Sequence, residues 1–379
     1  MRRTAIAICA LVLLFSGPLS GATLRVPSQY PTIWSAIIQS SPSPGDTILV
    51  APGDYSEPSL SVSGTSRITL ISEGGREVTA IHSLWNNVIT ITTSSDFILK
   101  GFTLRPLYTG GIGIAIGGGS QNILISDCSI SGAATGVHLL DCSGSIINCI
   151  FSECQWGASV GNGATSCFIS ENEFSGCLSS GIDIGGPAGN VTISNDDIHN
   201  SSIAGIRILD SPNNSSGSVI IEHNRIHDNF YGIEVTSLYS TTIESNTIAR
   251  NQMMGIYLHP GCALSYLAIN KNIIVSNDYA GIVVDACSNP YLACNDVWGN
   301  SHYANGNYVG YITDQTGYNG NISTDPFFCN ALGGDYSLAA NSPALHASCG
   351  VMGAIATPGC SNQTAVEHLS WGKIKALYK

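Results

Sequence analysis

Residues 181–200 read GIDIGGPAGNVTISNDDIHN, and this stretch contains the pattern on which the fold depends. Ile182 and Ile184 alternate with Asp183, and a second alternation begins at Val191 after a turn rich in glycine. Apolar residues at every second position predict short strands with one buried face, and Gly-Gly-Pro-Ala-Gly predicts the turn between them. Ile198 then resumes the buried face. Three short strands, and no helix, are therefore expected before the next opening glycine.

The same phrase, Gly-apolar-x-apolar followed by a turn and a second alternating run, recurs along the chain. It opens at Gly113, Gly136, Gly157, Gly181, Gly205, Gly232, Gly255 and Gly281, so the seven intervals average 24 residues. A repeat of this length cannot bury a hydrophobic core alone and must stack on its neighbours. The chain is therefore predicted to be a solenoid.

Polar residues keep a fixed place in each repeat and form two columns. The first column is Cys128, Cys149, Asn172, Asp196, Asn224, Asn246, Asn272 and Asn295, and the second runs from Ala133 through Cys154, Cys177, Ser201, Asn229, Asn251 and Asn277 to Asn300. Neighbouring rungs of a parallel coil lie about 4.8 Å apart, so stacked asparagines can bond to each other and to the turn backbone. Asn also tolerates the left-handed backbone that sharp turns demand. We therefore expect a structural ladder of Asn172, Asn224, Asn246, Asn272 and Asn295.

This pattern resembles that of the right-handed parallel β-helix repeat proteins of the secreted, bacterial-type pectate-lyase-like superfamily. Further runs similar to that group lie at residues 30–33, 45–50, 52–57, 324–327, 335–338 and 342–345, so the likeness covers roughly residues 24–360. It implies an all-β, single-stranded right-handed parallel β-helix with three short strands per coil and short capping helices at both ends. The superfamily includes lyases, hydrolases, esterases, epimerases and non-catalytic surface proteins, so the resemblance does not select an activity.

The two ends of the chain have different compositions from the repeats. Arg2 and Arg3 precede an apolar run and small residues up to Ala22, which predicts a signal peptide at 1–22; the run is shorter than the roughly 20 residues of a membrane span. A β-helix domain is expected over 23–360, with an N-terminal cap helix near 31–40. Residues 361–379 predict an amphipathic tail that serves as a C-terminal lid or, alternatively, as a sorting or attachment segment.

The net charge of −12 limits the class of partner. Nucleic acid is not expected, because a phosphate backbone requires a basic face. A neutral glycan is compatible with this charge, whereas a strongly anionic polysaccharide would need bridging cations or a local basic patch. A monomer that is secreted or displayed at the cell surface, without a membrane span, is the expected form.

The cysteines are compatible with an oxidising compartment. Cys9 is the only one of the 13 cysteines within residues 1–22, which leaves an even number. The pairs within the two columns are interpreted either as disulfides or as buried thiols that replace asparagine. Cys349 with Cys360 is the favoured disulfide outside the repeats. No Cys-x-x-Cys pair is present, so no structural zinc site is predicted.

The x position of the opening strand points outward, so successive x residues are expected to form a row. That row is Ala115, His138, Ser159, Asp183, Arg207, Glu234, Tyr257 and Val283. Acid, base and aromatic side chains on a flat sheet are typical of a polysaccharide groove. The alternative is an ion-pair ladder between neighbouring strands with a structural role only.

Roles for the row follow from the residue types. Asp183, Arg207 and Glu234 are the catalytic candidates, because carboxylates act as general acid and base and Arg207 can neutralise a uronate. The carboxylates could also hold Ca²⁺. His138, Tyr257 and His259 are the substrate-binding candidates. A second polar group at the strand exits comprises Asp141, Asp210, His259 and Asp285, where aspartate also serves as a turn former.

The sequence therefore predicts a secreted or surface β-helix protein that binds polysaccharide along the solenoid face and lacks a recognisable catalytic motif. The alternative is a polysaccharide lyase or glycoside hydrolase that acts on uronate-type glycans in a groove beside Asp183, Arg207 and Glu234. The third possibility, a periplasmic metal-handling β-helix, rests only on the shared repeats, because the sequence shows no His, Met or Cys ligand cluster that supports it. If neither binding nor turnover is found, a structural surface role is left.

Overall fold

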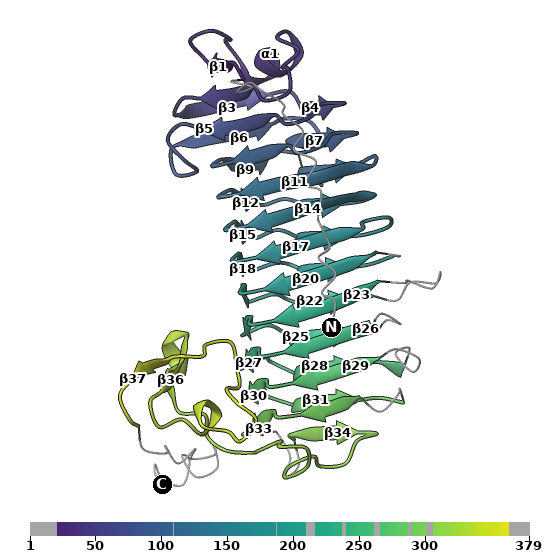
Figure 1. Ribbon diagram of the computed structural model, residues 1–379, viewed down its shortest axis with the longest axis vertical. Coiled ribbons are helices and arrows are strands. Elements are labelled where there is room, and N and C mark those ends of the chain that lie inside the picture. Colours follow the sequence, from purple (N-terminus) through teal and green to yellow (C-terminus); the bar gives the residue numbers. More distant parts are fainter. Residues whose placement is uncertain are drawn as a thin grey trace, which may run out of the picture.

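The computed structural model is an elongated solenoid of stacked coils (Figure 1). It describes residues 21–108, 110–186, 188–209, 217–236, 240–260, 266–286, 290–300 and 306–363. The predicted signal peptide at 1–22 and tail at 361–379 lie almost entirely outside these ranges, and Asp210 also lies outside them.

Each complete coil contributes one strand to each of three parallel sheets, named A, B and C in chain order. The 12 strands of sheet A are β1 (Thr23–Val26), β2 (Thr47–Val50), β5 (Thr69–Ser72), β8 (Ile98–Lys100), β11 (Ser120–Ser126), β14 (Cys142–Ile147), β17 (Ser166–Ser170), β20 (Asn190–Ser194), β23 (Ser218–Glu222), β26 (Ser240–Glu244), β29 (Leu267–Asn270) and β32 (Tyr291–Ala293).

Sheet B contains short strands, most of them three residues long. Its 11 strands are β3 (Gly53–Glu57), β6 (Thr79–Ser83), β9 (Thr103–Pro106), β12 (Ser129–Ser131), β15 (Ile150–Ser152), β18 (Glu173–Ser175), β21 (Asp197–His199), β24 (Arg225–His227), β27 (Thr247–Ala249), β30 (Ile273–Val275) and β33 (Asp296–Trp298).

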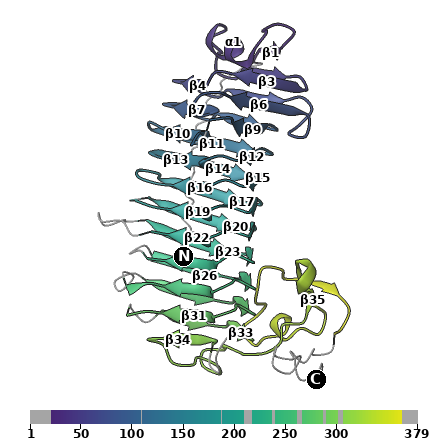
Figure 2. The same cartoon turned by 180° about the vertical axis from the view of Figure 1, so that it is seen from behind.

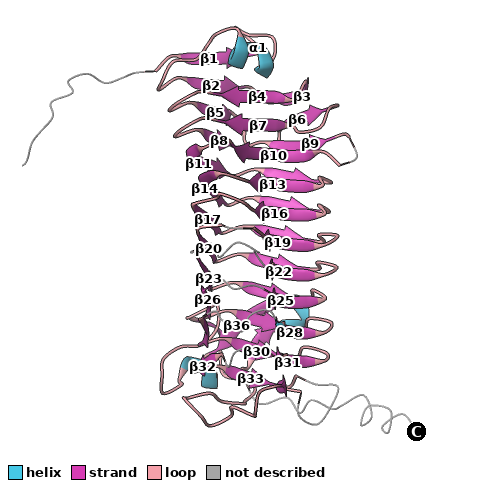
Figure 3. Ribbon diagram, turned by 90° about the vertical axis from the view of Figure 1, so that its right-hand side faces the viewer, coloured by secondary structure: helices cyan, strands magenta, loops and turns pink. Residues whose placement is uncertain are grey.

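Sheet C contains the strands that open with the Gly-apolar-x-apolar phrase, and Figure 3 shows many of them stacked one above another. Its 11 strands are β4 (Leu60–Ser63), β7 (Ile89–Thr92), β10 (Ile112–Gly117), β13 (Thr135–Leu139), β16 (Trp156–Val160), β19 (Ser180–Ile184), β22 (Ala204–Ile208), β25 (Tyr231–Val235), β28 (Met254–Leu258), β31 (Ala280–Val284) and β34 (Tyr308–Gly310). The predicted β-helix with three strands per coil is confirmed.

The core is made of apolar columns that run along the axis. Ile182 pairs in register with Ile206, and Ile206 with Ile233, and all three side chains are fully buried. The same column continues through Ile256 and Ile282. Because like residues face each other on successive coils, each coil buries the apolar surface that it cannot cover alone.

The first polar column forms a continuous chain of hydrogen bonds inside the bend between sheets A and B. Asn246 donates its backbone N–H and its Nδ2–H to Oδ1 of Asn272, at 2.9 and 3.0 Å. The same Nδ2 also donates to the carbonyl of Ile221 in the preceding coil, at 2.8 Å. Equivalent pairs link Asn172 to Asp196, Asn224 to Asn246, Asn272 to Asn295, and Asn295 to Asn321. This arrangement satisfies backbone groups that the tight bend would otherwise bury without partners.

The left-handed residue of each bend is the one before the ladder, so the expectation that the ladder asparagines adopt this conformation was wrong. Asn195 has φ of 57° beside the ladder residue Asp196, and Ser245 has φ of 55° beside Asn246. The reversal in chain direction is made at the residue before the ladder position, which leaves the ladder side chain free to point inward. Glu171 and Lys271 also take this conformation, so the position does not require Asn.

The cysteines of the two columns are buried free thiols, which decides between the two interpretations of them. Cys149 Sγ lies 3.8 Å from the carbonyl of Ile125, in the place where a ladder asparagine donates to an isoleucine carbonyl. Cys154 makes the same contact with Ile130. Burial raises the pKa of the Cys154 thiol to about 11, so it stays protonated at neutral pH. These thiols replace asparagine in the ladder.

Within the described part of the chain there is one α-helix, α1 (Ile33–Ile38), which lies at the N-terminal end of the solenoid (Figures 1 and 3). Thr32 caps it through a reciprocal pair of hydrogen bonds with Ser35. Ile33, Ala36 and Ile37 pack into the main core. The helix predicted near 31–40 is therefore present, but the described residues contain no α-helix at the other end. The helix expected at the C-terminal end falls within the predicted tail, which lies almost entirely outside the described residues, so it stays a prediction.

A small unit follows the last coil and packs beside sheet B (Figure 2). It consists of β35 (Phe328–Asn330), β36 (Asp335–Ala339) and β37 (Pro358–Cys360), with the 3-10 helices η2 (Ala331–Gly333) and η3 (Pro343–Leu345). Tyr336, Leu338 and Met352 of this C-terminal unit share a buried cluster with Ile273 and Val275 of sheet B. The unit therefore covers the last coils of sheet B.

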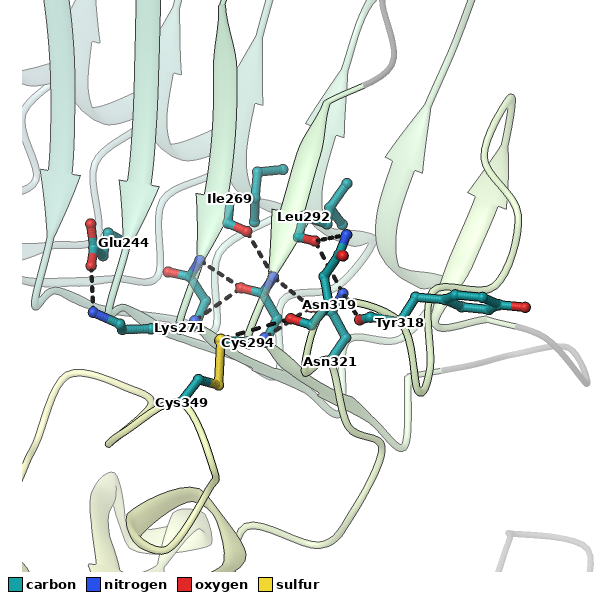
Figure 4. The surroundings of a disulfide bond; sticks show 11 residues. Glu244, Ile269, Lys271, Leu292, Cys294, Tyr318, Asn319, Asn321 and Cys349 are labelled. Carbon is teal, nitrogen blue, oxygen red and sulfur yellow. Dashed lines mark hydrogen bonds and ion pairs between the residues drawn. A yellow bond between two sulfur atoms is a disulfide. The ribbon is translucent and has the colours of Figure 1, made fainter.

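Two disulfides hold the C-terminal unit, and they correct the predicted pairing. Cys349 pairs with Cys294 and not with Cys360, whereas Cys360 pairs with Cys329. Figure 4 shows Cys349 reaching Cys294 beside the end of the ladder at Asn321. The physical reason is that the unit folds back onto sheet B, which brings Cys349 to a solenoid bend far from it in sequence. Disulfides are typical of compartments outside the cytoplasm.

Among the described residues, no helix is both long enough and apolar enough to span a membrane.

Candidate functional site

The predicted outward row lies on sheet C, where its members occupy consecutive rungs. Asp183 pairs in register with Arg207 and Arg207 with Glu234. Glu234 pairs with Tyr257, and His138 lies two strands from Asp183 through Ser159. Because adjacent parallel strands lie about 4.8 Å apart, side chains of neighbouring rungs can touch.

Asp183 and Arg207 form an ion pair along this row. Arg207 Nε donates to Asp183 Oδ1 at 2.7 Å, and only 11% of the Asp183 side chain is exposed. Burial raises the pKa of the Asp183 carboxyl, and the Arg207 guanidinium opposes this rise. The ion pair therefore offsets part of the cost of burying the Asp183 carboxylate away from water.

Glu234 and Tyr257 each bond to a side chain at the exit of a neighbouring strand. His259 Nε2 lies 2.8 Å from Glu234 Oε1, and the Tyr257 hydroxyl donates to Asp285 Oδ2 at 2.7 Å. Burial and the Asp285 carboxylate raise the pKa of Tyr257 to about 12, so the phenol stays protonated at neutral pH. The structure thus joins the outward row to part of the predicted group at the strand exits.

Aromatic rings cover the same part of sheet C. The rings of Tyr257 and His259 lie 3.9 Å apart between centroids, and Tyr231 lies 5.6 Å from Tyr257. Phe230 packs edge-on against Tyr231 at 4.7 Å. Tyr231 was not predicted from the sequence. Its signal is that it directly precedes the opening glycine. Gly232 and Ile233 both face inward, so Tyr231 lies on the same outer face as Glu234 and Tyr257.

The remaining candidates lie apart from this cluster. His138 is separated from Asp183 by the rung of Ser159, and burial lowers the pKa of its imidazole. Asp141 has a left-handed backbone with φ of 47°, in keeping with its alternative interpretation as a turn former. We name the connected residues Asp183, Arg207, Tyr231, Glu234, Tyr257, His259 and Asp285 the sheet C cluster.

The sheet C cluster offers two kinds of contact to a ligand. Its aromatic rings provide apolar faces, and its carboxylates, imidazole and guanidinium provide fixed hydrogen-bonding groups. Each charged group already has a partner, which fixes its orientation. Within the described ranges, no three His, Cys, Asp or Glu side chains converge closely enough to hold a metal ion. Ca²⁺ binding therefore stays a prediction.

Comparison with known proteins supports the fold. A family model described as right handed beta helix region matches residues 135–297. No curated protein sequence matches the chain significantly.

Several solved structures share the architecture at low sequence identity. Pectate lyase Pel9A is 14% identical, with a TM-score of 0.60 over 86% of this chain and 90% of that one. An alginate lyase from Paenibacillus sp. str. FPU-7 is 16% identical, with a TM-score of 0.54 over 77% of this chain and 99% of the other. A mutant of the periplasmic alginate epimerase AlgG is 18% identical, with a TM-score of 0.50 over 79% and 73% of the two chains. Identities this low establish a shared fold, and the chain is therefore a right-handed parallel β-helix similar in architecture to pectate lyase, alginate lyase and alginate epimerase structures.

Proposed function

We propose that the protein acts outside the cytoplasm and binds a polysaccharide along sheet C, with the sheet C cluster as the main contact. The observation that carries this proposal is the alignment of Tyr231 and Tyr257 with Arg207 and Glu234 on consecutive rungs of one flat sheet. A chain of sugar rings lying along the axis would meet aromatic faces and fixed polar groups in turn. Similar folds occur in proteins named as lyases or epimerases of pectate and alginate, which supports a polysaccharide as the ligand.

Binding to a panel of immobilised polysaccharides, neutral and uronate-containing, tests this proposal. Tyr257→Ala removes an aromatic face and is expected to weaken binding by about tenfold or more, because truncation of a central aromatic costs about 2 kcal/mol or more. Tyr291→Ala is the matched control, since Tyr291 is 53% exposed on sheet A. Equal binding by both variants, or no binding by the wild type, would contradict the proposal.

A second candidate function is cleavage of a uronate polysaccharide by β-elimination beside Asp183, Arg207 and Glu234. The specific observation is that Arg207 lies on the rung next to Glu234, whose carboxylate contacts the imidazole of His259. In such a reaction Arg207 would neutralise the uronate carboxylate. A base would take the C5 proton, the C4–O bond would break, a C4–C5 double bond would form, and the leaving oxygen would take a proton.

Absorbance of the unsaturated product, followed with and without added Ca²⁺ or a chelator, separates catalysis from binding. If the protein is a lyase, Arg207→Ala abolishes turnover and Arg105→Ala, an exposed residue of sheet B, retains it. Binding without any unsaturated product would leave the binder as the correct function. A hydrolase would release reducing ends without this absorbance, so both products are measured.

A further inference from the structure

A polar hollow lies on the bend between sheets A and B, away from sheet C. Its volume is about 290 Å³, and its polar lining includes Arg76, Asn148, Glu171, Glu173, Asp197 and Arg225. We name these six residues the bend groove. None of them belongs to the outward row predicted from the sequence.

Two sets of side chains line the floor on successive rungs. Asn148 and Glu171 occupy the left-handed positions of neighbouring bends, with φ of 53° and 60°. Glu173 pairs in register with Asp197, and Asp197 with Arg225, along sheet B. From Asn148 to Arg225 the groove crosses three rung spacings, which is about 14 Å.

Both ends of the bend groove carry a guanidinium that is held in place. Arg76 comes from the loop between β5 and β6, and its NH1 donates to the carbonyl of Asn148 at 2.7 Å. Arg225 NH2 donates to Asp197 Oδ2 at 2.7 Å, and the other oxygen of Asp197 lies 3.0 Å from His227 Nε2. These contacts orient the polar groups before any ligand arrives.

The charges and the lining limit the chemistry of the ligand. Arg76 and Arg225 face the carboxylates of Glu171, Glu173 and Asp197, so carboxylates outnumber guanidiniums in a chain of net charge −12. A polyanion is disfavoured by this balance. No metal-holding group of side chains exists among the described residues, and the mainly polar lining does not suit an apolar ligand. Donors at both ends with acceptors between them suit hydroxyl groups, which both donate and accept hydrogen bonds.

We propose that the bend groove is a second saccharide site, which takes one or two sugar rings of a neutral glycan. Small-molecule sites usually have volumes of about 300–1,000 Å³, so this hollow fits a short segment and not a polymer chain. The proposal shares its ligand class with the proposed function, but it depends on different residues on another face. Each can therefore fail separately.

Calorimetric titration of the protein with cellobiose, mannobiose and galactobiose tests the site. At least one of these disaccharides is expected to bind to the wild type. Arg76→Ala and Glu173→Gln are each expected to weaken that binding by about tenfold or more, because each removes a charged hydrogen-bonding partner. Arg105→Ala, on β9 of the same sheet but outside the groove, is expected to leave it unchanged, and Tyr257→Ala removes any contribution of sheet C to the titration. Thermal unfolding of each variant verifies that it is folded.

Three results would overturn the proposal. The first is that none of the three disaccharides binds. The second is that Tyr257→Ala abolishes binding while folded Arg76→Ala and Glu173→Gln retain it, which would place all recognition on sheet C. The third is that digalacturonate or sulfate binds at the groove more tightly than every neutral disaccharide. Disaccharide binding that survives Tyr257→Ala and is lost in the groove variants supports the second site even if sheet C binds nothing.

Discussion

At the residue scale, one hydrogen-bonded member of the asparagine ladder carries a carboxyl group in place of an amide. Asp196 Oδ1 accepts from the backbone N–H and from Nδ2 of Asn172, at 2.7 and 2.9 Å. Its Oδ2 is buried, and the described residues provide no hydrogen-bond partner for it. Burial raises the pKa of Asp196 to about 8, so the carboxyl is neutral at pH 7 and imitates the amide that it replaces.

This shift gives the stability a defined pH dependence. Between the ordinary value of 3.8 and about 8, the folded protein keeps a proton that the unfolded chain releases. The contribution of Asp196 to the free energy of unfolding is therefore full below pH 3.8 and falls by about 1.4 kcal/mol per pH unit until about pH 8. Asp196→Asn removes this loss. The stability of the variant relative to the wild type is therefore expected to increase as pH rises from 5 to 8.

Denaturant unfolding of both proteins at several pH values measures this gain. Asp296 also has a raised pKa, to about 7, and it is present in both proteins, so the difference between them isolates Asp196. Parallel stability curves for wild type and variant would show that Asp196 is ionised in the fold.

At the element scale, the C-terminal unit is attached to sheet B by contacts of several kinds. Arg250 NH1 donates to the carbonyl of Ala331 at 2.9 Å, and the ring of His227 packs against Tyr336 at 4.9 Å. His227 also lies between the carboxylates of Asp197 and Asp228, at 3.0 and 2.8 Å. The disulfide from Cys294 to Cys349 supplements these contacts.

Removal of that disulfide is expected to loosen the C-terminal unit and leave the coils intact. A Cys294→Ser, Cys349→Ser double variant loses the cross-link that limits its local opening. Limited proteolysis should cut the double variant within residues 311–360 faster than it cuts the wild type. The N-terminal fragment, which contains the coils, should resist further cleavage. A Cys142→Ser variant, which changes a buried free thiol of β14, is the comparison for the loss of a cysteine alone. Unchanged cleavage in the double variant would show that packing alone holds the unit.

The sequence correctly predicted the elements that repeat, but it did not predict contacts that occur only once in the structure. Period-two alternation placed Asp183, Arg207 and Glu234 on neighbouring rungs, because register in a solenoid follows from the repeat itself. The pairing of Cys349 with Cys294 depends on a unit that folds back once, so no periodicity indicates it. Tyr231 and the bend groove were missed for a related reason. Their side chains stand at repeat positions where only one or two repeats carry that type of residue, so the repeat pattern does not single them out.

At the scale of the whole molecule, the solenoid behaves as a one-dimensional stack in which each coil packs mainly on its two neighbours. Residues 149–171 make one complete coil, containing β15, β16 and β17. Their deletion joins Asn148 directly to the ladder residue Asn172. Asn148 has the same left-handed backbone as Glu171, the residue that precedes Asn172 in the intact chain. All three sheets then keep their order.

The shortened protein is expected to fold, whereas a partial deletion is not. Deletion of 149–160 removes β15 and β16 but keeps β17. The chain would then run from β14 directly to β17, two strands of sheet A, without the strands of sheets B and C between them. Circular dichroism and cooperative thermal unfolding distinguish the two products. Loss of folding in the whole-coil deletion would contradict the one-dimensional account of stability.

The central claim is that the outer face of sheet C is a polysaccharide-binding surface organised by the register of its strands. A crystal structure of the protein with an oligosaccharide chosen from the binding panel tests it most directly. The account predicts a sugar chain along the solenoid axis, with rings over Tyr231 and Tyr257 and hydroxyl or carboxylate groups at Arg207 or Glu234. A bound chain that lies only on sheet A, or only on sheet B, would contradict it.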